Sequence, residues 1–266
     1  EAVASTPGGV LVAGVFGGKA IFGQGQAGET TLSASDIAEA FLARYDTGGE
    51  LLWVRADGGP DGADHAESVV SDGDGNAFVT GSFSAAAVFG AGQPQQTTLD
   101  AVGSRDLFLA RYDADGALAW VEGAGSFYGH DGGQGVAIAS DGGVLVCGHF
   151  TNVALFDQGG PAPVTLLGPG GSDVFLARYS ADGAFSWVPP AGGVGQDTAR
   201  ALAAAPGSGA FVVGTFEGTA TFGVAPAQES LVSAGGSDVF LARYGPDGAL
   251  LWAIRAGGAG NDEATW

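Results

Sequence analysis

The stretch FLARYDADGALAW, residues 108–120, decides the fold because near copies of it occur three more times in the chain. The other copies read FLARYDTGGELLW (41–53), FLARYSADGAFSW (175–187) and FLARYGPDGALLW (240–252). Their first phenylalanines are separated by 67, 67 and 65 residues. A second landmark, the glycine of VAGVF, VTGSF, VCGHF and VVGTF, recurs at intervals of 67, 67 and 66 residues. Self-similarity at a fixed long period predicts a repeat architecture.

Each repeat is predicted to consist of β-strands. In the third copy, GVAIAS (135–140) leads through a DGG turn to VLVCGHF (144–150), and a variable stretch precedes DVFLARY (173–179) and AFSWV (184–188). Strand-like segments bounded by Gly and Asp turns give about four strands per repeat. Both faces of FLARY are largely apolar, which favours small sheets packed face to face around an axis over a two-sheet sandwich. We therefore predict an all-β fold, specifically a β-propeller.

The predicted organisation is a single β-propeller domain over residues 1–266, with repeats at 1–67, 68–134, 135–200 and 201–266. Both ends of the sequence fall at the same position of the repeat. This phase favours ring closure between the first and last repeats, and a larger protein with more repeats remains an alternative.

The segment YDADGALAW (112–120) is typical of a β-hairpin whose turn is made by Asp and Gly. A tryptophan follows each turn at a constant distance, where its large ring can pack against the neighbouring sheet. We expect four equivalent buried contacts between blades, made by Trp53, Trp120, Trp187 and Trp252.

Units of the form DVFLARYxxDGALLW, AGGxGxDxA and VAxxxDGxxxVxGxF resemble the bacterial extracellular β-propeller repeats of the SBBP type, over essentially the whole chain. The resemblance implies a propeller fold and no particular activity, since members of that family are mostly of unassigned role. The turn before the tryptophan also resembles the docking motif of quinoprotein propellers, although here the aspartate stands seven residues before Trp53 and Trp120. Repeats of about 66 residues exceed the usual blade of ~40–50. The excess lies in stretches such as 16–36, which we expect to form an extended hairpin.

Net charge excludes several classes of partner. The 266 residues carry 9 Lys and Arg against 29 Asp and Glu, a net charge of −20. Nucleic acid and anionic membrane surfaces would be repelled, and no apolar run approaches the ~18 residues that span a bilayer. A chain that lacks methionine and starts at Glu1 is expected to be processed, which fits an extracellular or cell-surface protein. Cys147 is the only cysteine and is expected to be a small buried strand residue.

Two acidic positions and one arginine recur in every repeat, and we predict structural roles for them. An arginine three residues after the phenylalanine lies on the opposite face from an acid two residues before it. We therefore expect each arginine to bridge to an acid of the next blade, with Asp131 or Asp173 as the partner of Arg111. The recurring residues are Arg44, Arg111, Arg178 and Arg243; Asp64, Asp131, Asp197 and Asp262; and Glu39, Asp106, Asp173 and Asp238.

Metal and cofactor motifs have plainer interpretations. GQGQAG (23–28) matches G-x-G-x-x-G but precedes a strand-like segment, so it is interpreted as a loop. DGDGN (72–76) gives Asp72, Asp74 and Asn76 the oxygen spacing of a calcium loop, but Ala77 and Phe83 replace its glycine and bidentate glutamate. A turn is expected there, with a Ca²⁺ site as the alternative, and no other cofactor is predicted.

The histidines and the remaining polar residues give no catalytic set. His65, His130 and His149 lack the further ligand that a metal centre needs, and His149 is expected to be an exposed strand residue. Neither a G-x-S-x-G elbow nor a Ser/His/Asp set is brought together by the repeat.

The second repeat breaks the pattern at GAGSFYGHDGG (123–133), where Phe127, Tyr128 and His130 stand in a glycine loop. Aromatic faces beside polar groups can bind sugars or peptide side chains. The alternative is that the rings fill a gap between blades.

Two functions of different class follow from the sequence. The leading hypothesis is a non-catalytic extracellular scaffold or recognition module that binds a glycan or a protein, or that assembles with itself. The alternative is a polysaccharide hydrolase or lyase that uses carboxylates at the propeller mouth.

Overall fold

The computed structural model describes residues 2–34, 37–127, 129–158, 160–161 and 163–264. Over these residues the chain forms strands and turns, which confirms the predicted all-β class. None of them forms a helix long and apolar enough to cross a membrane. The chain divides into two compact units, Glu1–Gly123 and Ala124–Trp266.

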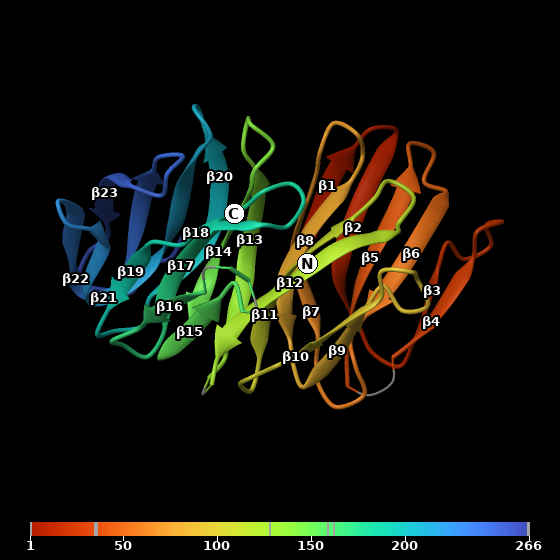
Figure 1. Cartoon of the computed structure of the whole chain (residues 1–266), viewed down its shortest axis with the longest axis horizontal. Helices are drawn as coiled ribbons and strands as arrows, with labels where there is room; N and C mark the ends of the chain where they lie inside the picture. Colours follow the sequence, from red (N-terminus) through yellow and green to blue (C-terminus); the bar gives the residue numbers. More distant parts are fainter. Residues whose placement is uncertain (1, 35–36, 128, 159, 162, 265–266) are drawn as a thin grey trace. The chain divides into compact units, whose positions relative to one another are not determined.

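Unit one contains two antiparallel four-stranded meanders (Figure 1). The first meander has the order β1-β2-β5-β6 and the second β7-β8-β11-β12. A short hairpin, β3–β4 or β9–β10, is inserted between the second and third strands of each. The strands are β1 (Ala2–Thr6), β2 (Gly9–Phe16), β3 (Lys19–Phe22), β4 (Thr30–Ser33), β5 (Glu39–Asp46), β6 (Leu51–Asp57), β7 (His65–Ser71), β8 (Ala77–Phe83), β9 (Ala86–Phe89), β10 (Thr97–Asp100), β11 (Asp106–Tyr112) and β12 (Leu118–Ser126).

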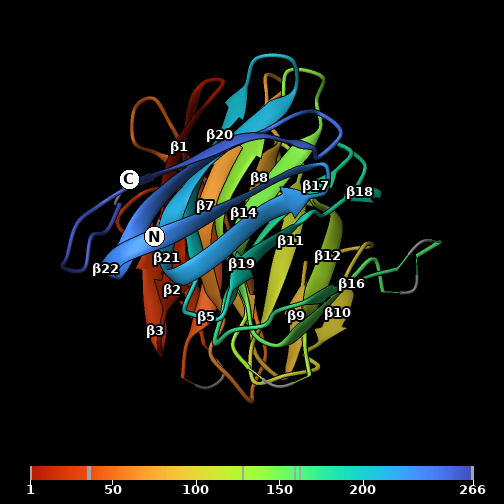
Figure 2. The ribbon, with the colours of Figure 1, turned by 90° about the vertical axis from the view of Figure 1, so that its left-hand side faces the viewer.

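Unit two contains two further meanders. In the third, β13, β14 and β17 are followed by a fourth strand that Pro189 and Pro190 divide into β18 and β19, since proline cannot donate to the ladder. In the fourth, the inserted hairpin is continuous with β21 and β22, the long pair of strands in Figure 2. The strands are β13 (Gly132–Ile138), β14 (Val144–Phe150), β15 (Val153–Phe156), β16 (Val164–Leu167), β17 (Asp173–Tyr179), β18 (Phe185–Trp187), β19 (Pro190–Gly193), β20 (Thr198–Ala205), β21 (Gly209–Val224), β22 (Ala227–Tyr244) and β23 (Leu250–Ala256).

The recurring glycine of the second strand is required by a close approach of backbone. A Cβ at Gly81 would lie 1.8 Å from the carbonyl oxygen of His65, and one at Gly148 would lie 1.9 Å from that of Gly132. The first strand of each of these meanders has an irregular register just beyond this point, which is typical of a β-bulge. A side chain at this position would separate the first two strands.

Neighbouring meanders within a unit pack face to face. In unit one β1 and β2 pack on β7, and in unit two β13 and β14 pack on β20. Small and aromatic side chains from both meanders fill each interface. Cys147 is 0% exposed in this core, so its predicted burial is confirmed.

The inserted hairpins of the second and fourth meanders also join the meander before them. Val88 of β9 forms a bridge with Gly58, and β21 pairs with β19 through Thr221 and Gly192. The extra length of the repeat therefore lies in a hairpin between the second and third strands, as expected, and it connects two meanders.

Trp53 and Trp187 each contact the β-turn of the following meander. The indole nitrogen of Trp53 donates to the carbonyl of Ala114 at 2.9 Å, and a Cβ at Gly116 would lie 2.8 Å from the ring. Trp187 donates in the same way to Pro246 at 2.9 Å and lies against Gly248. The absence of a side chain at the glycine of the turn thus leaves room for the indole ring.

The tryptophans differ in their degree of burial. Trp53 is 9% exposed, whereas Trp120, Trp187 and Trp252 are half-buried. The rings of Trp120 and Trp252 lie 6.2 Å from Phe78 and 6.0 Å from Phe211. The expectation of four equally buried rings is therefore corrected: the neighbourhood of each ring sets its burial.

Truncation of Trp53 to Ala should lower the free energy of unfolding by about 3–5 kcal/mol, because it removes a buried ring and one of the two hydrogen-bond donors to the Ala114 carbonyl. Urea unfolding followed by circular dichroism measures the change. Leu52→Ala, at a side chain that is 53% exposed, is the control and should change stability by less than about 0.5 kcal/mol. A loss below about 1 kcal/mol for Trp53→Ala would contradict the docking role.

Candidate binding site

Recurring aspartates connect loops of neighbouring meanders. Asp64 follows β6, and its carboxylate accepts hydrogen bonds from Gly59 N in its own loop and from Ser84 N after β8, both at 3.0 Å. Asp131 in unit two accepts from Ser126 N at 2.6 Å and from Thr151 N at 2.8 Å. Both carboxylates are 1% exposed. Asp64 therefore holds the loop after β6 against the end of β8, and Asp131 joins Ser126 to Thr151.

The corresponding aspartates of the third and fourth repeats, Asp197 and Asp262, make some of the same hydrogen bonds. Asp197 is 0% exposed and accepts from Glu217 N at 3.1 Å. Asp262 accepts from Gly258 N at 2.8 Å. Burial raises the pKa of Asp197 to about 7; the amides of Glu217 and Gly193 oppose this rise, and the negative charges of Asp173 and Glu217 add to it.

The recurring arginines contact turns, and the predicted arginine-to-acid bridge between blades is wrong for two of them. Arg44 donates to the carbonyls of Ala114 at 2.6 Å and Pro7 at 2.7 Å. Arg178 pairs with Asp141, which belongs to its own meander, and donates to the carbonyl of Ser208 in the next at 2.6 Å. Carbonyls at the turns have no partner in the strand ladder, so they supply the acceptors that the guanidinium needs.

Arg111 and Arg243 stack on rings of their own meanders. The guanidinium of Arg111 lies over Phe78 and 3.7 Å from the carboxylate of Asp113. That of Arg243 lies 5.5 Å from the centre of the Phe211 ring. The guanidinium groups of Arg111 and Arg243 therefore pack on phenylalanine rings of their own sheets.

The calcium candidate forms a closed turn. One oxygen of Asp72 accepts from the amides of Asp74 and Asn76, at 3.0 and 2.9 Å, and the other accepts from the Asn76 side chain at 2.7 Å. Both oxygens thus stabilise the turn before β8. In the part of the chain that the structure describes, no group of three His, Cys, Asp or Glu side chains is arranged to hold a metal. Ca²⁺ binding there stays a prediction.

The aromatic break of the second repeat is only partly described. Phe127 is 56% exposed and His130 is exposed, while Tyr128 lies outside the described residues. His149 was expected to be exposed and is instead half-buried, since β14 packs against β20. Burial, together with the charges of Arg200 and His130, lowers the pKa of His149 to about 4. The imidazole is therefore neutral at physiological pH.

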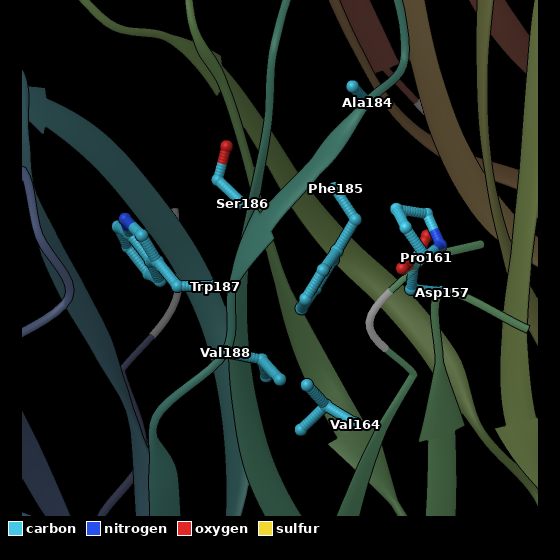
Figure 3. A pocket seen from close by; sticks show the side chains of 8 residues that line it. All are labelled: Asp157, Pro161, Val164, Ala184, Phe185, Ser186, Trp187 and Val188. Carbon is cyan, nitrogen blue, oxygen red and sulfur yellow. The ribbon is translucent and has the colours of Figure 1, made fainter.

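A cavity of about 370 Å³ lies in the third meander and was not found by sequence reasoning (Figure 3). It is bounded on one side by β18, with Phe185 and Trp187, and on the other by Asp157, Pro161 and Val164 of the β15–β16 hairpin. The indole of Trp187 is held in place by its bond to Pro246. We call this cavity the β18 cleft.

In the first two meanders a glutamine fills the corresponding place. Gln26 accepts from Leu51 N at 2.7 Å and donates to the carbonyl of Gly49 at 2.8 Å. A Cβ at Gly23 would lie 2.8 Å from the Gln26 oxygen, so the glycine is needed beside the glutamine.

The second meander repeats this arrangement. Gln93 accepts from Leu118 N at 2.5 Å and donates to Gly116 at 3.1 Å. Gly90 takes the place of Gly23. The side chain of Gln26 or Gln93 thus closes the gap between the hairpin and the fourth strand in each of these meanders. We call this side chain the glutamine plug.

The third meander has lost this plug. FGQGQ (22–26) and FGAGQ (89–93) become FDQGG (156–160), so Asp157 replaces the glycine and Gly160 the glutamine, while Phe185 replaces leucine. A Cβ at Gly160 would overlap the Asp157 carboxylate, so a side chain there would require that carboxylate to move. The result is an open cleft with apolar walls and one carboxylate. The replacement of glycine and glutamine at the hairpin tip is visible when the copies of the repeat are aligned.

Comparison with known proteins adds no function. No protein-family model matches the chain, and no curated protein matches it. Among solved structures, the chain is similar to a protein of unknown function from Bacteroides caccae, at 10% sequence identity and a TM-score of 0.37, over 96% of this chain and 81% of that one.

The raised pKa of Asp197 makes stability depend on pH. The folded carboxyl ionises near pH 7 and the unfolded one near 3.8, so the folded chain holds an additional proton between these values. Its contribution to the free energy of unfolding therefore falls as the pH rises from about 4 to about 7.

Between pH 5 and pH 8 we expect the wild type to lose on the order of 1–3 kcal/mol more than Asp197→Asn, which has no such carboxyl to ionise. Urea unfolding of both proteins at the two pH values measures the difference. Equal losses in the two proteins would show that Asp197 is already ionised at pH 5.

Proposed function

We propose that the protein is a non-catalytic extracellular recognition module, a β-propeller of four repeats, that binds a partner protein in the β18 cleft. The observation that carries the proposal is the loss of the glutamine plug in the third meander. Two meanders close this gap with a side chain from the hairpin, and the third leaves it open between an aromatic strand and a carboxylate.

The chemistry of the cleft supports binding over catalysis. Glycoside hydrolysis needs two carboxyl groups about 5–9.5 Å apart across the scissile bond. Asp157 is the single carboxylate among the described lining residues, and Phe185, Trp187 and Val164 make the walls apolar. Asp64 and Asp131, two acids whose pKa is raised, are buried and accept hydrogen bonds from backbone amides. They are thus shielded from a substrate.

Charge favours a basic partner segment. The net charge of −20 attracts cationic surfaces, and the charged group of the cleft is also an acid. An apolar cavity with one fixed polar group is the usual form of a binding site. A lysine or arginine side chain would place its aliphatic stem on Phe185 and its charge at Asp157.

Ring closure between the first and fourth repeats is the second part of the proposal. Ser84, Thr151 and Glu217 each donate an amide to the aspartate of the preceding repeat. The corresponding residue of the first repeat is Gly17. Closure therefore supplies Asp262 with the amide of Gly17 as its second donor.

Hydrogen exchange at the Gly17 amide tests closure. In a closed ring Asp262→Ala should speed exchange of a peptide that contains Gly17, because the amide loses its acceptor. Asp64→Ala is the matched control and should speed exchange at Ser84. Unchanged exchange at Gly17 alongside a faster Ser84 would contradict the closed ring.

Restoring the plug tests the cleft. A peptide-display library and a glycan array are screened with the wild type, and each ligand is then titrated against the double variant Asp157→Gly/Gly160→Gln. We expect a peptide ligand whose affinity falls at least about tenfold, or 1.4 kcal/mol, because the glutamine occupies its site. Val194→Ala, at a residue that is 76% exposed and outside the cleft, should leave affinity unchanged.

Three outcomes would contradict the proposed function. The first is the absence of any ligand, the second is equal binding by the plugged variant, and the third is cleavage of an arrayed polysaccharide. A glycan that binds without turnover and is lost in the plugged variant would keep the recognition role and correct the class of partner.

A further inference from the structure

A second cavity, of about 230 Å³, borders Asp173 at the start of β17. Its lining includes Pro169, Pro190 and Thr221, and it shares no lining residue with the β18 cleft. The corresponding acid of the fourth meander, Asp238, shows which hydrogen-bond donors can reach a carboxylate at this position.

In the fourth meander two donors reach one oxygen of the buried acid, Oδ2 of Asp238, while its Oδ1 accepts no hydrogen bond from a described residue. Asp238 is 0% exposed, and its Oδ2 accepts from Ala234 N at 2.8 Å and from the Arg255 guanidinium at 2.7 Å. The arginine side chain is 35% exposed, so it reaches the carboxylate from the surface.

In the third meander prolines replace both donors. Ala234 stands four residues before its acid, and Pro169 stands four residues before Asp173. Arg255 pairs with Phe240 across the sheet, and Pro190 pairs with Phe175 in the same register. Proline has no N–H, and its ring carries no charge. Compared with Asp238, Asp173 therefore lacks an amide donor and a guanidinium.

The remaining contacts leave Asp173 poorly satisfied. The residue is 1% exposed; its Oδ2 accepts from Gly170 N at 3.3 Å, and its Oδ1 accepts no hydrogen bond from any described residue. Burial raises the pKa of this carboxyl to about 6, opposed by the nearby amides of Gly170 and Gly193. An unsatisfied buried carboxylate is costly, so a nearby cavity suggests that a ligand supplies the missing donor.

We propose that this cavity binds a guanidinium group carried on an aliphatic chain, as in an arginine side chain, with Asp173 as its counter-ion. Arg255 on Asp238 is the intramolecular version of the same contact. Pro169 and Pro190 give apolar walls for the aliphatic stem. A planar guanidinium has several N–H donors, enough for both carboxylate oxygens. The proposal does not depend on the β18 cleft.

Agmatine, a guanidinium on a short aliphatic chain, is the probe. We expect it to bind the wild type with one-to-one stoichiometry in an NMR titration and to bind Asp173→Asn at least about tenfold more weakly. Pro190→Arg should also abolish binding, because it places an intramolecular guanidinium on Asp173, and should raise the melting temperature.

The controls separate this site from charge effects and from the cleft. Pro206→Arg adds the same charge at an exposed proline elsewhere and should still bind agmatine. The plugged variant Asp157→Gly/Gly160→Gln should bind it as the wild type does. n-Butylurea, a neutral analogue, should not bind. Absence of agmatine binding, or equal binding by the wild type and Pro190→Arg, would overturn the proposal.

Discussion

The buried carboxylate of Asp64 holds two meanders at a fixed distance, and the other contacts of unit one depend on that distance. One oxygen accepts from the loop after β6 and the other from the amide after β8. A carboxylate suits this position because its two oxygens can accept hydrogen bonds from both loops, so that only one polar side chain has to be buried. Only at this spacing can Trp53 reach the Ala114 carbonyl and Arg44 lie between the turns. In unit two, Asp131 likewise accepts from two backbone amides, those of Ser126 and Thr151.

Most of the strand pattern could be predicted because its signals are local. The spacing of FLARY, the Asp and Gly turns and the alternation around Cys147 each lie within about ten residues. The partners of Arg44 could not be predicted in this way, because backbone carbonyls leave no trace in the sequence. His149 was placed at the surface from its neighbours in the repeat, and the packing of β20 on β14 buries it.

The candidate sites were harder to find because they depend on contacts over long sequence distances. Gln26 matters through its bond to Leu51, 25 residues later, so its replacement by Gly160 has meaning only once that bond is known. The aromatic residues at 127–130 are easy to find in the sequence because they interrupt the glycine-rich loop that the other repeats share. The two prolines beside Asp173 are equally visible, yet their significance comes from the register that pairs Arg255 with Phe240.

The glutamine plug has a consequence for how the fold can vary. Gly23 and Gln26 lie at the tip of a hairpin whose strands stand outside the four-stranded meander. In the third meander Asp157 and Gly160 replace this pair, Phe185 replaces the core leucine that is Leu118 in the second meander, and a cavity opens beside them. The meander can thus act as a constant frame and the hairpin tip as an interchangeable part. A protein engineer could change these positions in each meander separately and display several different clefts on one scaffold.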